Sequence, residues 1–264
     1  YVITYAEVGK YLKLDISYLD GYGTVENLSS STSDLILDTT APDQPVITTT
    51  TSLTNDSTPD YTFYSNEAGT ITYGGSCSSS TYFASSGNNA INFTALPDGT
   101  YSNCTIIVTD NASNASNTLS VSSFVIDTTA PSATITSAAY HLTNGTITLT
   151  GTNLDTMNVS SPASTDHKTY LDWSKFSWDI NGDNATTSNA PTLSSSDITS
   201  VYVPNASTMT ITLVGSAKSA LEATAGFGAS GGTDTLDITA GFIKDIYGNA
   251  ASTDARANGT ISYS

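Results

Sequence analysis

Two cysteines are the residues best suited to form a covalent cross-link. Cys77 and Cys104 are the only cysteines of the chain, and both lie in its middle part. An even pair of cysteines in an exported β-domain indicates a disulfide, because the compartment is oxidising. Closing a loop of about 28 residues would contribute roughly 3 kcal/mol in the chain-entropy model. The alternative is a pair of buried free thiols.

Oxygen-bearing side chains at alternate positions indicate a second kind of chemistry, the binding of a divalent cation. The segment 179–184 reads Asp-Ile-Asn-Gly-Asp-Asn, so Asp179, Asn181 and Asp183 offer the ligands that calcium prefers. The segment departs from the EF-hand pattern, because glycine is not at the sixth place and Ala190 stands where the closing glutamate would be. The alternative is a plain Asn-Gly hairpin turn.

Two further aspartates open a repeated five-residue segment. The sequence Asp-Thr-Thr-Ala-Pro occurs at 38–42 and again at 127–131. Proline stiffens such a linker, while aspartate can bind a backbone amide or a metal ion. A calcium ion at each linker would stiffen it, with Asp38 or Asp127 as one ligand. Further ligands would come from interdomain loops, such as Asp98, Asp110 or Asp245. The alternative is that each linker aspartate caps a turn.

The sequence shows no pattern of a catalytic site. It contains no nucleophile elbow, phosphate-binding loop, zinc pattern or dinucleotide fingerprint. His141 and His167 have no companions at ligand spacing, so each is interpreted as an ordinary surface or core residue. Carboxylates are numerous, so a glycosidase pair stays open, but nothing in the sequence singles one out. We therefore expect no enzymatic activity.

Composition and charge exclude several classes of partner. The 264 residues include 24 Asp and Glu but only 7 Lys and Arg, which gives a net charge of −17 at pH 7. A chain this acidic repels phosphate, so nucleic acid and anionic membranes are poor partners. No apolar run approaches the roughly 20 residues of a spanning helix, so no membrane insertion is expected. The first residues do not resemble a signal peptide. The composition favours a mature or excised piece of a longer exported protein.

Hydrophobic periodicity predicts an all-β protein of tandem β-sandwich domains. The two linkers divide the chain into a partial repeat at 1–37, a sandwich at 38–126 and a larger sandwich at 127–264. Short strands of period two, separated by turns rich in Gly, Asn and Pro, fill the middle segment.

The last segment carries similar strands and one predicted helix. Ser216 is the expected N-cap, residues 217–224 form the helix with Leu221 facing the core, and Gly226 ends it. Aromatic and polar residues alternate over 173–178, which predicts a strand that leads to the Asn-Gly turn.

Residues 1–37 are too few for a domain. Apolar side chains occupy the even positions of 11–18, which predicts a strand, and 20–23 predict a turn. Two strands alone are marginally stable in water, so they need a partner sheet. A neighbouring subunit could supply it by strand addition. The assembly contacts would then be Tyr11, Leu12, Leu14, Ile16 and Tyr18. In a piece cut from a longer protein, the segment is simply a partial repeat.

The three segments resemble bacterial surface-protein repeats. The middle segment is similar to the bacterial immunoglobulin-like (Big-type) family, whose members run from an Asp-Thr-x-Ala-Pro linker to a Thr-Asp-x-x-x-Asn turn, here at 109–114. Residues 8–12, 17–24 and Glu26 resemble the tail of another repeat. Residues 149–154, 173–183 and 242–245 resemble repeats of very long adhesin-like and haemagglutinin-like proteins. The resemblance implies an extracellular stalk, adhesin or filament, often rigidified by calcium.

Together, these observations favour a structural role. We expect a non-catalytic component of an extracellular bacterial surface appendage. Its partners would be copies of itself or adjacent repeats of the same protein, and host or surface glycans. The first alternative is a carbohydrate-binding adhesive module, which needs a row of exposed aromatic side chains. The second is a secreted hydrolase, which needs converging carboxylates in a cleft.

Overall fold

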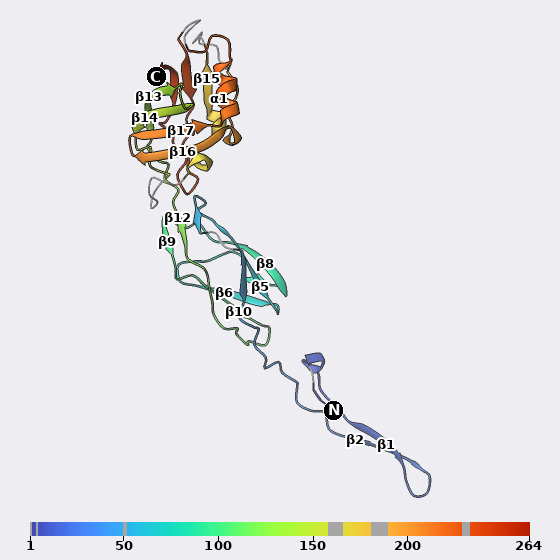
Figure 1. Cartoon of the computed structure of the whole chain (residues 1–264). Helices are drawn as coiled ribbons and strands as arrows, with labels where there is room; N and C mark the ends of the chain where they lie inside the picture. Colours follow the sequence, from blue (N-terminus) through green and yellow to red (C-terminus); the bar gives the residue numbers. More distant parts are fainter. Residues whose placement is uncertain (1, 4, 50–51, 158–165, 181–189, 229–232) are drawn as a thin grey trace. The chain divides into compact units, whose positions relative to one another are not determined.

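Figure 1 shows the computed structural model of the chain, which describes residues 2–3, 5–49, 52–157, 166–180, 190–228 and 233–264. Strands dominate the regular secondary structure, which confirms the predicted all-β class. The chain divides into two compact units, one of residues 1–52, 58–96 and 100–124, the other of 53–57, 97–99 and 125–264. The three predicted domain boundaries and the immunoglobulin-like type stay predictions. Among the described residues, no helix is long and apolar enough to span a membrane.

The N-terminal ribbon, residues 9–37, is a two-stranded antiparallel hairpin that follows a short 3₁₀ segment, η1 (Tyr5–Glu7). Its strands are β1 (Asp15–Leu19) and β2 (Val25–Ser29), and every residue of both is exposed. The turn between them places Gly23 at φ +80°, a conformation that glycine adopts without a steric penalty.

The middle domain, as we call residues 38–126, has ten short strands in three sheets among its described residues. Two sheets have the orders β11-β10-β6-β7 and β3-β5-β8, and a third has the order β4-β12-β9. The strands are β3 (Val46–Thr49), β4 (Leu53–Thr54), β5 (Asp60–Ser65), β6 (Gly69–Gly74), β7 (Phe83–Ala84), β8 (Gly87–Asn92), β9 (Gly99–Tyr101), β10 (Thr105–Thr109), β11 (Leu119–Ser120) and β12 (Phe124–Ile126).

Alternation of inward and outward residues builds the core of this domain. In β5 and β10 every second residue is buried, as the period-two pattern predicts. Stacked rings continue the core, because Phe93 lies 5.8 Å from Tyr61 and 6.0 Å from Phe124 between ring centroids. The strands therefore form where β-branched and aromatic residues can be buried on one face.

The last domain, residues 127–264, is built on one seven-stranded sheet of order β15-β18-β19-β13-β14-β17-β16. All its neighbouring strands are antiparallel except β13 and β19, which run parallel. The strands are β13 (Thr134–His141), β14 (Thr146–Thr152), β15 (Phe176–Asp179), β16 (Ile198–Asn205), β17 (Thr208–Leu213), β18 (Thr235–Ile238) and β19 (Arg256–Tyr263). The short 3₁₀ segments are η2 (Lys168–Tyr170), η3 (Trp173–Lys175) and η4 (Ser195–Asp197).

The predicted helix is present, but its start was predicted wrongly. Helix α1 spans Gly215–Glu222 and begins after Val214, so Ser216 lies inside the first turn and is not the N-cap. Leu221 is buried in the core, as predicted from the helical period.

The alternating segment 173–178 is only partly the predicted strand. Its first three residues form η3, because the Asp172 carboxylate accepts a hydrogen bond from Ser174 N at 3.2 Å and caps a tight turn. The strand β15 begins at Phe176, and Trp173 is buried from the turn rather than from the sheet.

Candidate functional site: linker clasps and an acidic cluster

A five-residue turn that starts with aspartate occurs once in the middle domain and once in the last domain. In the turn 110–114, Asp110 Oδ1 accepts hydrogen bonds from Ala112 N and Asn114 N, both at 2.8 Å. The backbone closes the turn, because Asp110 N donates to Asn114 O at 3.0 Å. Ser113 takes φ +74° to complete it.

The turn 245–249 of the last domain repeats this geometry. Asp245 Oδ1 accepts from Tyr247 N and Asn249 N, both at 2.9 Å, and Asp245 N donates to Asn249 O at 3.0 Å. Gly248 takes φ +96° where the other turn has Ser113. Each turn therefore holds an asparagine as its fifth residue in a defined position.

Each of these asparagines binds the linker that precedes its own domain. Asn114 Nδ2 donates to the backbone oxygen of Asp38 at 3.1 Å, and Asn249 Nδ2 donates to the backbone oxygen of Asp127 at 2.7 Å. We call each of these hydrogen bonds a clasp. The residues that it joins are 76 positions apart in one case and 122 in the other. The sequence analysis named five aspartates as candidate ligands at the linkers, Asp38, Asp98, Asp110, Asp127 and Asp245, but did not identify either asparagine as a donor.

The linker aspartates also cap turns through their own side chains. Asp38 Oδ1 accepts from Thr40 N at 3.0 Å, and Asp127 Oδ1 accepts from Thr129 N at 2.9 Å. This is the arrangement given above as the alternative to metal binding. At the second linker, Asp98 Oδ1 accepts from Thr128 N at 2.9 Å, which lowers the pKa of Asp98.

The first linker carries an acidic cluster that the second lacks within the described ranges. Asp38, Glu67 and Asp110 each offer a carboxylate oxygen, and these oxygens lie within 4.8 Å of one another. The sequence analysis named Asp38 and Asp110 as candidate ligands but not Glu67. Together the three carboxylates have the oxygen chemistry that a calcium ion binds.

Electrostatics within the cluster are unfavourable without a cation. Partial burial, followed by the negative charges of Asp38, Asp110 and Asp43, raises the pKa of Glu67. Hydrogen bonds from Asn114 lower the pKa of Asp110, so that carboxylate stays ionised beside Glu67. A bound cation would offset this repulsion.

Glu67→Gln is expected to stabilise the middle domain in calcium-free buffer at neutral pH, because it removes a repelled and partly desolvated charge. The pKa of Glu67 is raised above its usual 4.5, so the folded domain takes up the proton more readily than the unfolded chain does. The advantage of the variant should therefore shrink as the pH falls toward 4.5. Urea unfolding at several pH values measures this, with Glu26→Gln in β2 as the control. An advantage that grows on acidification would contradict the expected electrostatics.

Within the described part of the chain, no other predicted metal ligand is brought into such a cluster. Asp179 is buried at the end of β15, while Asn181 and Asp183 lie outside the described residues. The calcium loop at 179–184 therefore stays a prediction. Asp245 is buried, and both of its carboxylate oxygens accept hydrogen bonds from Asn249.

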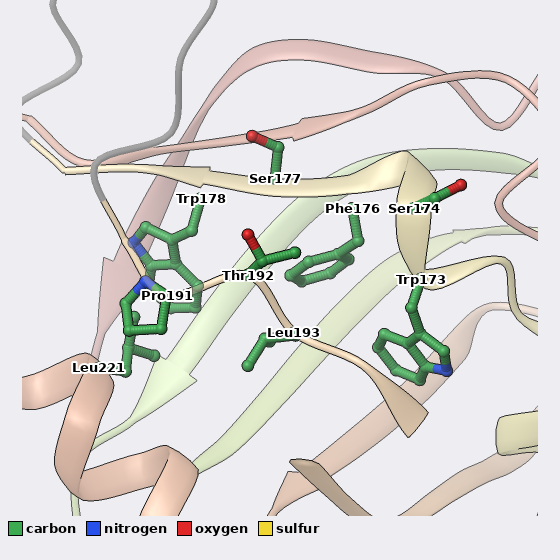
Figure 2. Close-up of a pocket in the computed structure, with 9 residues that line it drawn as sticks. All are labelled: Trp173, Ser174, Phe176, Ser177, Trp178, Pro191, Thr192, Leu193 and Leu221. Carbon is green, nitrogen blue, oxygen red and sulfur yellow. The ribbon is translucent and has the colours of Figure 1, made fainter. Parts of the chain in front are cut away.

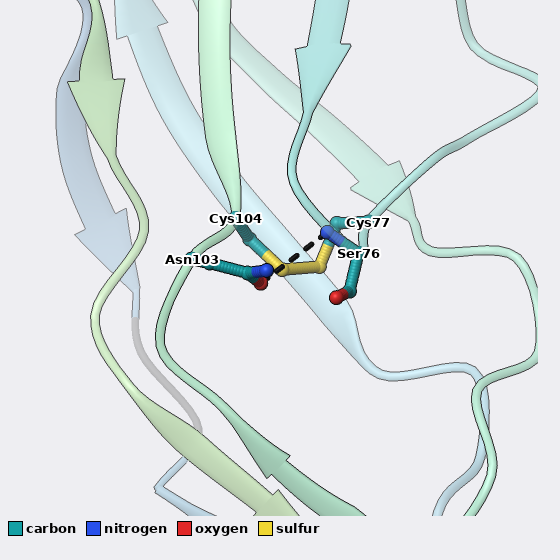
Figure 3. The surroundings of a disulfide bond; sticks show 4 residues. All are labelled: Ser76, Cys77, Asn103 and Cys104. Carbon is teal, nitrogen blue, oxygen red and sulfur yellow. Dashed lines mark hydrogen bonds between the residues drawn. A yellow bond between two sulfur atoms is a disulfide. The ribbon is translucent and has the colours of Figure 1, made fainter.

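The predicted disulfide is present. Cys77 and Cys104 are bonded with their Cα atoms 5.2 Å apart (Figure 3). Beside the disulfide, Ser76 N donates to Asn103 Oδ1 at 3.3 Å (Figure 3). The disulfide links the residue before β10 to the loop after β6, so it closes the domain independently of the linkers.

Neither tryptophan offers an exposed face to a sugar. Trp173 and Trp178 are buried, and they line a small cavity of about 140 Å³ together with Phe176, Leu193 and Leu221 (Figure 2). Ligand pockets are usually several hundred Å³, so this cavity is too small for a glycan. The tryptophans therefore serve the core, and they give no support to the carbohydrate-binding alternative.

Comparison with known proteins gave no match, either to a family model or to a curated protein sequence.

Proposed function

We propose that this chain is a non-catalytic structural component of an extracellular bacterial surface appendage, with immunoglobulin-like β-sandwich domains joined in series as a stiff spacer. The duplicated clasp is the observation that supports this most. Two linkers of identical sequence are each bound by an asparagine of the domain that follows, through the same turn. A stiff spacer needs its linkers to be held by such hydrogen bonds, because a free linker of five residues would act as a hinge.

Three further properties support an extracellular structural role. A disulfide forms and persists in oxidising compartments, which include the cell surface. The net charge of −17 keeps long arrays of such domains soluble. The acidic cluster at the first linker is the site that we propose for calcium, which would hold Asp38, Glu67 and Asp110 together. Calcium would then restrict the motion of the first linker in addition to the hydrogen bond of the clasp.

Calcium binding makes a separate prediction for the same Glu67→Gln variant. Millimolar calcium is expected to raise the thermal midpoint of the wild-type middle domain and to have less effect on the variant, since one of three carboxylate ligands is lost. An equal shift in both proteins would mean that calcium does not bind at this cluster.

The same cluster is the feature that a secreted hydrolase would need. A glycosidase requires two carboxyl groups free to act on the substrate. Asp110 does not meet this requirement, because Asn114 and Ala112 already donate to its carboxylate. We therefore keep the structural role as the proposal.

Removing both clasp donors tests the spacer. Asn114→Ala with Asn249→Ala deletes both clasps, of about 1 kcal/mol each, together with the hydrogen bonds that the same Nδ2 groups donate to Asp110 and Asp245. The unclasped fraction at each linker should therefore rise by roughly fivefold or more. Small-angle X-ray scattering of the full chain is expected to fit one domain arrangement for the wild type and a broad ensemble for the variant. Asn27→Ala with Asn88→Ala, two exposed asparagines outside the clasps and their turns, is the matched control. A wild-type profile that already requires a broad ensemble would refute the spacer.

A further inference from the structure

The exposed apolar side chains are concentrated at the start of the chain. Of the 19 large hydrophobic residues that are exposed among those described, 12 lie between residues 2 and 37. Soluble proteins rarely leave a large apolar face uncovered. Comparison of the N-terminal residues with the middle domain indicates which kind of partner covers this apolar surface.

The N-terminal ribbon has the same turn as the hairpin that follows β10. In the turn 20–24, Asp20 Oδ1 accepts from Tyr22 N and Thr24 N at 2.8 and 2.9 Å, as Asp110 does in 110–114. The flanking pair is also the same, since Leu19 lies opposite Val25 and Thr109 lies opposite Ala115. Around this turn the ribbon therefore aligns with the middle domain at an offset of ninety residues, and β1 corresponds to β10.

The two ends of the ribbon extend this correspondence. Gly9 N donates to Ile36 O at 2.8 Å, and Ile36 N donates to Lys10 O at 3.0 Å. The start of the ribbon thus lies beside its end, as β9 lies beside β12 in the middle domain. The distance along the chain from turn aspartate to linker aspartate agrees within one residue, 20 to 38 against 110 to 127. Residues 9–37 therefore correspond to 99–126.

Corresponding side chains differ in their exposure. Ile106, Phe124 and Ile126 are 0%, 4% and 1% exposed in the middle domain. Their counterparts Ile16, Leu35 and Leu37 are 45%, 41% and 68% exposed.

The difference follows from strands that the ribbon lacks. In the middle domain β10 pairs with β6 over five residues, and β12 runs parallel to β4. Among the described residues β1 has β2 as its only strand partner. Counterparts of β6 and β4 would pair with β1 and with residues 35–37.

We infer that the N-terminal ribbon is the closing part of a further β-domain of this kind, and that its apolar face docks onto the strands of another repeat equivalent to β3 through β8. The even-numbered side chains Leu14, Ile16 and Tyr18 become the buried face, as Cys104, Ile106 and Val108 are in the middle domain. One partner strand runs antiparallel to β1, and another runs parallel to residues 35–37.

The available area is sufficient for such an interface. Leu14, Ile16, Tyr18 and Leu28 share one face of the hairpin, and Leu35 and Leu37 have buried counterparts in the middle domain. Six side chains that each expose on the order of 100 Å² give roughly 600 Å², so with an equal area on the partner the interface buries roughly 1,200 Å², the size of a specific protein interface.

This inference makes the expected assembly role of residues 1–37 more specific. It rests on the proposed function in one respect, which is that the protein consists of repeats joined in series. The inference and the proposed function can be refuted separately. Scattering from the asparagine variants tests the linkers, whereas the following experiment tests only what covers the ribbon.

The test supplies the missing strands from the chain itself. A copy of residues 38–98 is fused directly before Gly9 of the full chain, because Gly9 corresponds to Gly99. The fusion carries Leu14→Cys, since Leu14 corresponds to Cys104. The added copy of Cys77 then has a partner, and we expect a second disulfide in most molecules, identified by mass spectrometry of the linked peptides.

Lys13→Cys in the same fusion is the matched control. Lys13 lies on the opposite face of the ribbon, where its ammonium contacts Asp15 at 3.1 Å. Since adjacent residues of a strand point to opposite faces, we expect about a tenth as much of the new disulfide from this variant. Equal cross-linking by the two variants would overturn the inference.

Two further measurements keep the inference falsifiable if the cross-link fails. In the fusion without Leu14→Cys, the amides of β1 should exchange at least tenfold more slowly than in the unmodified chain, and Ile16→Asp should restore fast exchange. Unchanged exchange overturns the inference. Sedimentation of the unmodified chain is the second measurement. A dimer that Ile16→Asp abolishes and Ser17→Asp preserves would identify a second copy as the occupant, and would also overturn it.

Discussion

Replacing Cys77 and Cys104 with alanine is expected to lower the free energy of unfolding of the middle domain by roughly 3 to 4 kcal/mol, because the disulfide closes a loop of nearly thirty residues. Both side chains are buried, so the loss includes the packing of the two sulfur atoms as well as the constraint on the unfolded chain. For a domain of this size, with small sheets of two- to six-residue strands, such a loss is a large part of the total stability.

Hydrogen exchange at the amides of β10 measures this loss in the full chain. Those amides follow Cys104 directly and lie in the centre of the sheet β11-β10-β6-β7. Tryptophan fluorescence gives an internal control, because Trp173 and Trp178 are the only tryptophans and both lie in the last domain. The urea transition of the last domain should not change. Adding a reductant should destabilise the wild type and leave the double variant unaffected. A loss below about 1 kcal/mol would mean that the disulfide does not constrain this domain.

Phe242→Ala is expected to lower the stability of the last domain by about 3 to 5 kcal/mol, in the range for fully buried phenylalanines. The ring is completely buried, with its centroid 5.8 Å from that of Trp173 and 5.5 Å from that of Phe176. The cavity left by alanine cannot collapse easily, because the backbone on both sides is fixed. Gly241 N and Ile243 N donate to the buried carboxylate of Asp254 at 3.0 and 2.6 Å.

The position of Phe242 connects this prediction to the clasp. The turn 245–249 begins three residues later, so a looser segment should also weaken the hydrogen bond from Asn249 to Asp127. Urea unfolding monitored by tryptophan fluorescence measures the stability, and hydrogen exchange at residues 245–249 reports on the turn. Phe83→Ala, which removes a half-exposed ring from the middle domain, should cost less than about 1 kcal/mol. Equal effects of the two substitutions would refute this account of the core.

Features that depend on residues close together in the sequence were largely predictable. The all-β class followed from period-two alternation, which β5 and β10 show with buried residues at every second position. The helix was located because Leu221 and Ala217 are spaced one turn apart, although its start was misplaced. Ser216 is a good capping residue by type, but the chain already turns into the helix after Val214.

The candidate site was predictable in part. The recurrence of Asp-Thr-Thr-Ala-Pro identified Asp38 and Asp127, and the loops containing Asp110 and Asp245 were named as their partners. The signal that was missed is the shared pattern of an aspartate followed four residues later by asparagine, at 110–114 and 245–249. That pattern marks Asn114 and Asn249, whereas nothing local marks Glu67 as a neighbour of Asp38.

By itself, then, the sequence determined where strands, turns and linkers form, since these depend on the side-chain period and on proline, glycine and aspartate at fixed local positions. It also determined that one disulfide could form, because only two cysteines exist. Only the tertiary structure decided which side chain donates a hydrogen bond to the backbone of each linker. The clasps join residues 76 and 122 positions apart, and such contacts depend on how strands pair across a sheet rather than on any local preference. The same reason applies to the N-terminal ribbon, whose alternation predicts an apolar face but whose register against 99–126 required the hydrogen bonds of the folded chain.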